Sequence, residues 1–390
     1  MDAFRLAALR ELFPVTREHV YLNHAGTGPL SRPAVAAVEA YLREQAETGE
    51  VPWPDAEAIA DRCRARLGQL LQVSPDTIAF TRNTSHGIVL AVNSIDWPKG
   101  ANVVLMKDAF PAVNYPFRLM LPDVEKRWTT SAELAAGPEA VFGLVDDRTR
   151  AVALPWVHFL TGRRFDVQAI ARFCRERGIT LIVDAIQGLG IVEEDWAEVG
   201  ADFVCSHGAK WLLAPQGSGF LYVRPDILPR LRPANLGWLS SRWESFEEIF
   251  SEKPVYESAR RLEEGTRNYL GIAGLDASLG LLLDIGIPVV EARVRALGHR
   301  LRVGLEAAGW EVVTPPDPAR SAGIIAFRKP GLNPSRVLTW LKQAKMVCAL
   351  REGLLRIAPH VYNSEYEIDR FLERLNDPRA ATAEPAPCAT

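Results

Sequence analysis

The stretch His207-Gly-Ala-Lys210-Trp-Leu-Leu-Ala-Pro-Gln-Gly-Ser-Gly-Phe-Leu-Tyr222 places one lysine in a neutral, largely apolar run beside a glycine-rich turn. A lysine amine that is held away from water loses part of its preference for the charged form, and it can then act as a nucleophile toward an aldehyde. The same pattern also fits a surface lysine whose aliphatic stem lies over apolar neighbours. Lys210 alone leaves both interpretations open.

An acidic residue follows a short apolar run upstream of this lysine, in Gly178-Ile-Thr-Leu-Ile-Val-Asp184-Ala-Ile-Gln187-Gly188. The β-branched run predicts a buried parallel strand that ends at the carboxylate. In open α/β sheets the ligand lies beyond the carboxyl ends of the strands, so we expect Asp184 at a ligand crevice. By itself Asp184 fits a helix cap equally well, but its combination with Gln187 and Lys210 indicates a cofactor site.

The pattern of apolar residues alternates between strand and helix over the first two thirds of the chain, which predicts a parallel sheet with helices on both faces. After about Leu270 it changes to two long helical regions followed by short strands, which predicts an α+β C-terminal domain. Helices are expected at residues 3–12, 32–47, 56–71, 88–92, 167–177, 272–283, 288–308 and 333–343. Strands are expected at residues 102–106, 151–154, 180–183, 202–205, 311–314, 322–327, 346–350 and 354–358.

Length and composition are typical of a two-domain cytoplasmic enzyme. The 390 residues exceed the roughly 250–300 at which one hydrophobic core stops growing. A net charge of -3 argues against a nucleic-acid or anionic membrane partner. The five cysteines show no C-x-x-C spacing, so the sequence implies neither zinc nor another metal and no disulfide framework. No signal-peptide pattern is present, and no apolar run approaches the ~20 residues of a membrane span.

In these segments the chain resembles the class V aminotransferase family of fold-type I pyridoxal-phosphate enzymes, and the resemblance extends from about Tyr21 to about Leu375. That family includes cysteine desulfurases, kynureninases and isopenicillin N epimerase-like proteins. The resemblance implies an α/β fold with a mainly parallel seven-stranded sheet and a smaller α+β domain. The domains implied are an N-terminal helix packing on the small domain (1–18), the large cofactor domain (19–270), the small domain (271–376) and a disordered tail (377–390).

The resemblance also implies roles for residues around pyridoxal 5'-phosphate. Lys210 would form the internal aldimine, and Asp184 would pair with the protonated pyridine nitrogen, which keeps the ring electron-withdrawing. Gln187 matches the residue that hydrogen-bonds the 3-oxygen of the ring, and Phe110 matches the residue stacked on its face. Phe159 replaces an asparagine of the family near a Thr-Gly turn, so Gln187 is left to bond that oxygen alone.

The cofactor phosphate is expected at the start of the apolar helical run 88–92. Thr84 and Ser85 match the phosphate-binding pair of the family, and a helix N-terminus offers unpaired N–H groups and a positive dipole end. Without the family, Asn-Thr-Ser before a helix is an ordinary N-cap. Near the lysine the chain departs from the desulfurase pattern, so either Ser206 or His207 is expected to reach the phosphate.

A further match is Thr266, at the position where the family lends a hydroxyl to the phosphate of the neighbouring subunit. It implies a homodimer with a shared active site, whereas the segment by itself reads as a turn into the next helix. Arg356 matches the arginine that binds the substrate carboxylate, because a planar guanidinium grips a carboxylate with two parallel hydrogen bonds; strand alternation alone would place it outward. Asn23 and His24 match the loop over the substrate, where His24 either orients the substrate or bonds within its own loop.

Desulfurases need a cysteine on a mobile loop, and the segment 338–346 has none. Cys348 lies in an apolar strand pattern, which is typical of a structural cysteine. The leading hypothesis is an enzyme that acts on a small-molecule substrate, an amino acid, through an external aldimine, as an aminotransferase or an isopenicillin N epimerase-like protein. The alternatives are a cysteine desulfurase-like C–S lyase and a non-catalytic binding protein that keeps the fold. The substrate side chain is not readable from the sequence.

Overall fold

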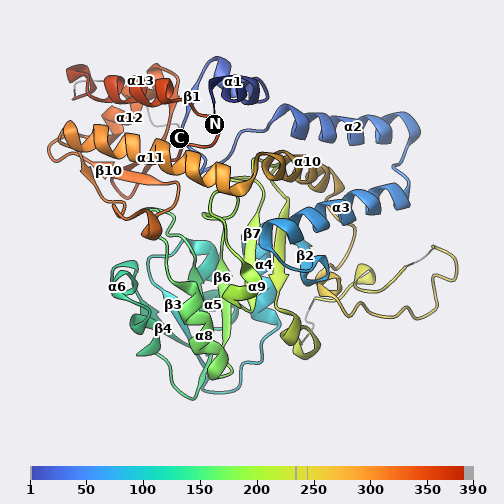
Figure 1. Cartoon of the computed structure of the whole chain (residues 1–390). Helices are drawn as coiled ribbons and strands as arrows, with labels where there is room; N and C mark the ends of the chain where they lie inside the picture. Colours follow the sequence, from blue (N-terminus) through green and yellow to red (C-terminus); the bar gives the residue numbers. More distant parts are fainter. Residues whose placement is uncertain (1, 233–234, 244, 382–390) are drawn as a thin grey trace.

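The computed structural model describes residues 2–232, 235–243 and 245–381, and a seven-stranded sheet lies at its centre (Figure 1). The strand order is β2-β8-β7-β6-β5-β3-β4. Only the two pairings of β8 are antiparallel, and the other four are parallel, which confirms the expected mainly parallel sheet. The strands are β2 (Ile78–Thr81), β3 (Asn102–Met106), β4 (Glu125–Thr129), β5 (Thr149–Pro155), β6 (Thr180–Asp184), β7 (Phe203–His207) and β8 (Gly219–Val223).

Helices cover the faces of this sheet, and its central strands are therefore buried along nearly their whole length. Helix α4 packs on β7 and β8, and α8 packs on β6. This arrangement explains why the central strands read as continuous apolar runs rather than as alternating ones. The helices that follow the strands are α4 (Thr84–Asn93), α5 (Pro111–Met120), α6 (Ser131–Ala136), α7 (Glu139–Phe142), α8 (Val167–Glu176) and α9 (Trp196–Val199).

Three further helices, α2 (Arg32–Thr48), α3 (Trp53–Leu71) and α10 (Tyr269–Ile285), pack against one another beside the sheet (Figure 1). Helix α10 is apolar over much of its circumference because it is enclosed by α2 and α3. Its one buried acid, Asp276, bonds Arg62 at 2.7 Å and Arg66 at 2.6 Å, both on α3. These ion pairs fix α10 against α3 while satisfying the buried carboxylate.

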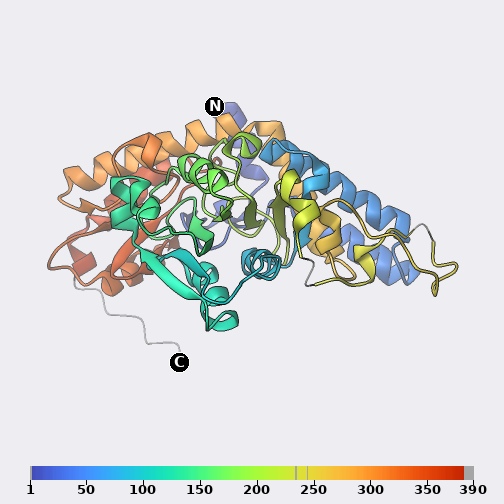
Figure 2. The ribbon, with the colours of Figure 1, turned by 90° about the horizontal axis from the view of Figure 1, so that it is seen from below.

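The C-terminal part of the chain forms a smaller α+β unit, coloured orange to red in Figures 1 and 2. Its antiparallel sheet has the order β12-β13-β10-β9. A short parallel pair, β1 with β11, joins the N-terminal segment to it. The elements are α11 (Ile287–Ala307), β9 (Glu311–Val312), β10 (Ile325–Arg328), α12 (Pro334–Gln343), β11 (Met346–Val347), β12 (Ala349–Arg351), β13 (Leu354–Ile357), α13 (Glu365–Leu375) and, from the N-terminus, α1 (Ala3–Glu11) and β1 (Val20–Tyr21).

The two hydrophobic cores divide within α11 rather than at residue 270, where the sequence placed the domain boundary. The larger core includes α10 and the first turns of α11 as far as Val294, and the smaller core begins at Leu297. The reason is that α11 is one continuous helix that leaves one core and enters the other. Within the described residues, no single helix is long and apolar enough to span a membrane; α10 and α11 pass that test only as a pair bent by 80°.

Both ends of the chain contact the rest of the molecule. Phe13, just after α1, stacks on Tyr362 with ring centroids 4.2 Å apart and belongs to the larger core. Arg10 of α1 pairs with Glu367 of α13 at 2.6 Å, so the N-terminal helix contacts both cores. Of the predicted tail, Pro378–Ala381 forms a 3-10 turn, and residues 382–390 lie outside the described part.

Candidate active site

Asp184 is the last residue of β6 and lies at the carboxyl edge of the central sheet. Its side chain is 4% exposed, and its Oδ1 accepts a 3.0 Å hydrogen bond from the backbone N–H of Ile186. Burial raises the pKa of this carboxyl to about 6, against the hydrogen bond and the charge of Lys210, which both lower it. Asp184 is therefore largely ionised at neutral pH and takes no salt-bridge partner among the described residues.

Lys210 lies in the turn that connects β7 to β8. The turn is closed by backbone hydrogen bonds from Gly208 to Ser218 and from Ala214 to Gly208. Gly28 of the N-terminal loop donates its N–H to the carbonyl of Ala209 at 2.8 Å. A Cβ at Gly28 would lie 2.1 Å from the Lys210 carbonyl oxygen, so only glycine allows the loop to approach the lysine so closely.

The lysine and the acid influence each other across the site. Burial lowers the pKa of Lys210 to about 8; Asp184 opposes this shift, and Arg356 and Arg351 add to it. A neutral amine is therefore accessible just above neutral pH, as nucleophilic attack on an aldehyde requires. Asp184 and Lys210 thus lie close enough for the charge of each to shift the pKa of the other.

An aromatic ring and an amide flank these two residues. The Lys210 Nζ lies 5.6 Å from the ring centroid of Phe110, which is 46% exposed and therefore presents a free face. Gln187 is buried, and its Oε1 accepts a 2.8 Å hydrogen bond from the indole N–H of Trp211. Its Nε2 donates to the carbonyl of Ala25 at 3.1 Å. These two bonds fix the orientation of the amide, and the second N–H of Nε2 has no hydrogen-bond partner among the described residues.

Two buried hydroxyls near the amino end of α4 lack a hydrogen-bond partner in the described part of the chain, Oγ1 of Thr84 and Oγ of Ser206. Unsatisfied buried polar atoms are costly, so a pair of them points to an absent acceptor or donor. Ser85 is exposed at the first turn of α4. Burial, followed by the charge of Lys210, lowers the pKa of His207 to about 4, so this imidazole is neutral; its Nδ1 already accepts from the Ala209 N–H at 3.0 Å.

The hydroxyls of Thr84 and Ser206 are suited to donate hydrogen bonds to a phosphate. Asn83 caps α4 by accepting the N–H of His86 at 2.9 Å, which leaves the N–H groups of Thr84 and Ser85 outside the capping bond. The close packing of α4 on β7 depends on Gly87, whose Cβ would lie 3.3 Å from Cβ of Cys205. The residues present therefore fit the phosphate end of pyridoxal phosphate, as hydroxyl donors at a positive helix end.

Arg356 is only 3% exposed, although strand alternation alone left an outward position open. Its neighbours Leu355 and Ile357 point into the smaller core, so the guanidinium projects from the opposite face of β13. Nη1 donates a 2.6 Å hydrogen bond to the carbonyl of Phe159, and Nε has no partner among the described residues. Burial, with a smaller effect from Arg351, lowers the pKa of Arg356 to about 10, so it stays charged and available to an anion.

Arg351 is a cation near the site that sequence reasoning missed. It lies on β12, and the register pairs Ala349 with Arg356 and Arg351 with Leu354. Directly opposed residues in an antiparallel pair share a face, so Arg351 and Arg356 emerge on the same side of the sheet. The side chain is exposed and forms no ion pair with any described residue. The Glu352-Gly353 turn, which joins two short strands, was the available signal for this hairpin.

The N-terminal loop is tied to the small domain. Asn23 bridges Ala358, and its Oδ1 has no partner among the described residues. Both ring nitrogens of His24 are bonded within the protein, Nδ1 to the carbonyl of Ala358 and Nε2 to the hydroxyl of Tyr362, each at 2.7 Å. His24 is fully buried, and burial lowers its pKa well below the ordinary value. Its bonds run to the small domain, so neither nitrogen is free for a substrate.

Thr266 is exposed and lies in the segment that precedes α10. It lines a cavity of about 270 Å³ with Arg82 and His86, and neither Lys210 nor Thr84 lines that cavity. A buried ion network holds the chain on both sides of Thr266. Glu263 bonds Arg64 at 2.7 Å and also bonds Arg267. The three side chains are 1–8% exposed. This network fixes the backbone that presents the Thr266 hydroxyl to the exterior.

Cys348 lies between β11 and β12 in the smaller core. It is 5% exposed, and burial raises the pKa of its thiol to about 12. The thiolate form is therefore negligible at neutral pH, and burial in a core hinders access of the thiol to a substrate sulfur.

Residues 20–371 match the family model described as Aminotransferase class-V. A probable hercynylcysteine sulfoxide lyase of Mycobacterium tuberculosis is 30% identical over 399 residues, which cover 96% of this chain and 95% of the relative. Isopenicillin N epimerase of Streptomyces clavuligerus is 28% identical over 386 residues, which cover 92% of this chain and 94% of the relative.

The fold also matches that of solved structures. A mutant of C-DES with glycine covalently linked to its PLP cofactor superposes with a TM-score of 0.87 at 23% identity, over 94% of this chain and 99% of that chain. The family match, which covers nearly the whole chain, confirms the expected family, fold type, enzyme class and cofactor. The protein therefore belongs to the class V aminotransferase family, whose members use pyridoxal phosphate.

Proposed function

We propose that this protein binds pyridoxal phosphate between Asp184 and Lys210 and acts at the α-carbon of an amino-acid substrate, as an aminotransferase or an isopenicillin N epimerase-like enzyme. The observation that carries the proposal is the mutual influence of the two side chains: the amine has its pKa lowered to about 8, and the facing carboxyl remains ionised above about pH 6. When bound, the cofactor supplies an electron sink for a carbanion at the α-carbon.

The residues divide this work among them. Lys210 would hold the cofactor and would move a proton at the α-carbon of the substrate. Asp184 would favour the protonated form of the pyridine nitrogen, and Gln187 would donate a hydrogen bond to the 3-oxygen. Phe110, whose ring is partly exposed, would lie against the cofactor ring. This division requires no additional titratable group close to the α-carbon.

The phosphate end is assigned to Thr84, Ser85 and Ser206, because the buried hydroxyls of the first and last lack other partners. His207 is placed beside them as a neutral imidazole. Arg356 binds the substrate carboxylate through the edge that carries its unpartnered Nε. Asn23 offers its free Oδ1 on the substrate side, and His24 positions the loop by bonding the small domain rather than by contacting substrate.

We also propose a homodimer in which Thr266 completes the phosphate site of the neighbouring subunit. Its support is that Thr266 is exposed and faces a cavity that Lys210 does not line. A cytoplasmic location is proposed from the nearly balanced charge and from Cys63, Cys174, Cys205 and Cys348, all buried and free of disulfides.

A second candidate is a C–S lyase that works by β-elimination. It is favoured by the 30% identity to a probable hercynylcysteine sulfoxide lyase, and elimination needs no attacking cysteine. The buried Cys348, with its thiol pKa near 12, disfavours the persulfide route of a desulfurase. A non-catalytic binding protein has no use for a carboxylate-binding Arg356 beside Lys210.

The test combines a panel of amino acids and S-oxidised cysteine thioethers with the cofactor-loaded protein in deuterated buffer. The proposal predicts loss of the α-proton signal in NMR spectra for at least one substrate, and Lys210→Ala abolishes it. A keto acid formed without release of ammonia, or an inverted configuration, supports the leading function, whereas pyruvate with ammonia supports the lyase. Absence of α-proton exchange across the panel, with cofactor bound, contradicts both.

A further inference from the structure

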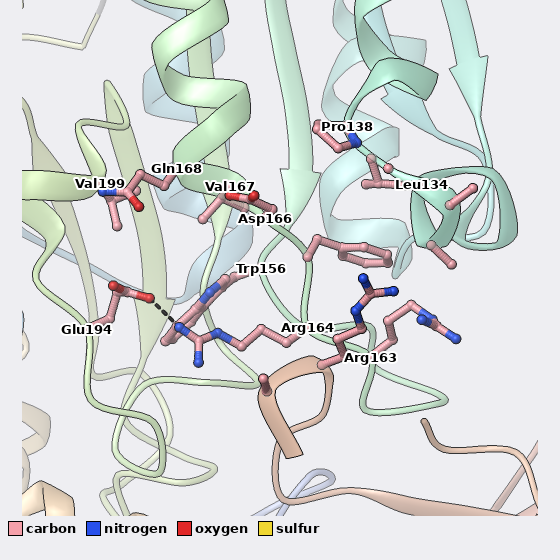
Figure 3. Close-up of a pocket in the computed structure, with 16 residues that line it drawn as sticks. Leu134, Pro138, Trp156, Arg163, Arg164, Asp166, Val167, Gln168, Glu194 and Val199 are labelled. Atoms are coloured by element: carbon pink, nitrogen blue, oxygen red, sulfur yellow. Dashed lines mark hydrogen bonds and ion pairs between the residues drawn. The ribbon is translucent and has the colours of Figure 1, made fainter. Parts of the chain in front are cut away.

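A second cavity, of about 470 Å³, lies between the connection from β5 to α8 and the 3-10 turn η6 (Pro318–Arg320) of the small domain (Figure 3). None of the candidate active-site residues lines it. Its volume is in the range of small-molecule sites. Because the lining comes from both the large sheet domain and η6, an occupant would contact both domains.

The carboxylates at this cavity are already engaged. Glu194 pairs with Arg164 at 2.5 Å, the dashed contact in Figure 3, and the Arg164 guanidinium lies 5.2 Å from the ring centroid of Trp156. Asp166 accepts the N–H of Ala169 at 2.9 Å and thereby caps α8. Glu194 is therefore paired with Arg164, and no ion pair joins Asp166 to Arg163 or Arg320.

Two arginines remain without such a partner. Arg163 lies on the side away from Glu194 (Figure 3), is partly buried, and has no hydrogen bond or ion pair from its guanidinium to any described residue. Arg320 has only a 3.8 Å contact with Asp317, in which the side chains are 65% and 52% exposed. Burial lowers the pKa of Arg163, and the charge of Arg320 lowers it further, as expected for two like charges in one region.

The backbone holds these charges together. Arg163 bridges Ser321 in an antiparallel pair, and the N–H of Arg164 donates to the carbonyl of Arg320 at 2.9 Å. The N–H of Ala322 donates to the carbonyl of Gly162, also at 2.9 Å. The main chain thus brings Arg163 and Arg320 side by side, so an anion between their side chains would offset the repulsion of the two charges.

We propose that this cavity is a second binding site, for a small molecule whose anionic end, a phosphate or a pair of carboxylates, lies between Arg163 and Arg320. The oxyanion takes charge-assisted hydrogen bonds from both guanidiniums, and the apolar side chains of Leu134 and Pro138 contact the remainder of the ligand. The site is independent of the chemistry at Lys210.

The test measures binding of inorganic phosphate and of malonate to cofactor-loaded protein by calorimetry. Loading occupies the phosphate site at Thr84, and a repeat with unloaded protein keeps the result independent of the cofactor assignment. We expect at least one anion to bind and Arg163→Gln/Arg320→Gln to weaken it roughly tenfold or more. The matched control is Arg336→Gln, an exposed arginine at the start of α12 with no side-chain bond among the described residues. Phosphate binding points to a phosphate ester and malonate binding to a dicarboxylate.

A second measurement needs no variant. The parent protein is treated with phenylglyoxal, and the modified arginines are mapped by mass spectrometry with and without the anion. The proposal predicts slower modification of Arg163 and Arg320 with the anion present, and unchanged modification of Arg336. It is overturned if neither anion binds, if the double variant binds as tightly as the Arg336→Gln control, or if the two arginines are not protected.

Discussion

The carbonyl oxygen of Phe159 accepts a 2.6 Å hydrogen bond from Nη1 of Arg356, so the main chain of the large domain positions a guanidinium of the small domain. One edge of Arg356 is thereby used, and its Nε is left for a ligand. Phe159 stands where the family pattern has asparagine, and its ring contacts Phe110 edge-on at 5.4 Å. Phe159 thus contacts both Phe110 and Arg356.

Substitution Arg356→Lys keeps the positive charge but removes the planar fork of donors. We expect kcat/KM for the amino-acid substrate to fall roughly tenfold to a hundredfold, as for the loss of one hydrogen bond to a charged group. The cofactor absorbance should be unchanged, because Arg356 does not hold the cofactor. Steady-state kinetics beside cofactor titration measure the two effects, and equal weakening of cofactor and substrate would contradict the assignment.

Arg351 is expected to tune the lysine through charge alone. It lowers the pKa of Lys210, so Arg351→Gln raises that pKa toward its ordinary value. The rate of covalent cofactor attachment to the unloaded protein should rise with pH through about 8, as the amine becomes neutral, and the midpoint should move to higher pH in the variant. Stopped-flow absorbance measures the profile, and an unchanged midpoint would show that Arg351 is too remote to act.

Asp184→Asn should move the same midpoint in the opposite direction. The carboxylate raises the pKa of Lys210, so its removal lowers that pKa and the amine becomes neutral at lower pH. The variant should nevertheless lose nearly all activity, because no anion then keeps the ring nitrogen protonated. An active Asp184→Asn enzyme, or a midpoint that moves upward, would refute this part of the account.

Ionisation of Asp184 also has a consequence for stability. Its folded pKa is raised to about 6 from an unfolded value near 3.9, so the folded state binds this proton more tightly. The contribution of Asp184 is therefore fully present below about pH 4 and is lost as pH rises through about 6. We expect Asp184→Asn to increase the unfolding free energy of the unloaded protein more at pH 7.5 than at pH 4.5, as measured by urea unfolding.

The network under Thr266 predicts a large structural effect. Replacing Glu263 by glutamine leaves Arg64 buried without a counter-charge, whereas Arg267 keeps its ion pair with Glu57, and the loss should cost about 3–5 kcal/mol of stability. Glu311→Gln, which removes the surface partner of Arg328, is the control and should leave the unfolding midpoint nearly unchanged. Urea unfolding of the two variants decides whether the buried network stabilises the segment 263–267.

The sequence predicts the central strands well, since the runs at 102–106 and 180–183 are apolar on both faces and coincide with β3 and β6. It misses β4, because Glu125–Thr129 is a polar edge strand paired on one side only. It also misses β2 and β8, where the sheet becomes antiparallel after the turn at Lys210.

In the site, the residues of the local motifs could be found from sequence, but their long-range partners could not. His24 bonds Tyr362, 338 positions away, and Arg356 bonds a main-chain carbonyl, which carries no side-chain signature. The nearness of Arg351 depends on strand register, which only the folded hairpin defines.

The most direct measurement of the central claim is borohydride reduction of the cofactor-loaded protein, followed by proteolysis and mass spectrometry. The account predicts that the reduced cofactor is found on the peptide containing Lys210 and that Lys210→Ala carries none. Recovery of the cofactor on another lysine, or on no peptide at all, would contradict it.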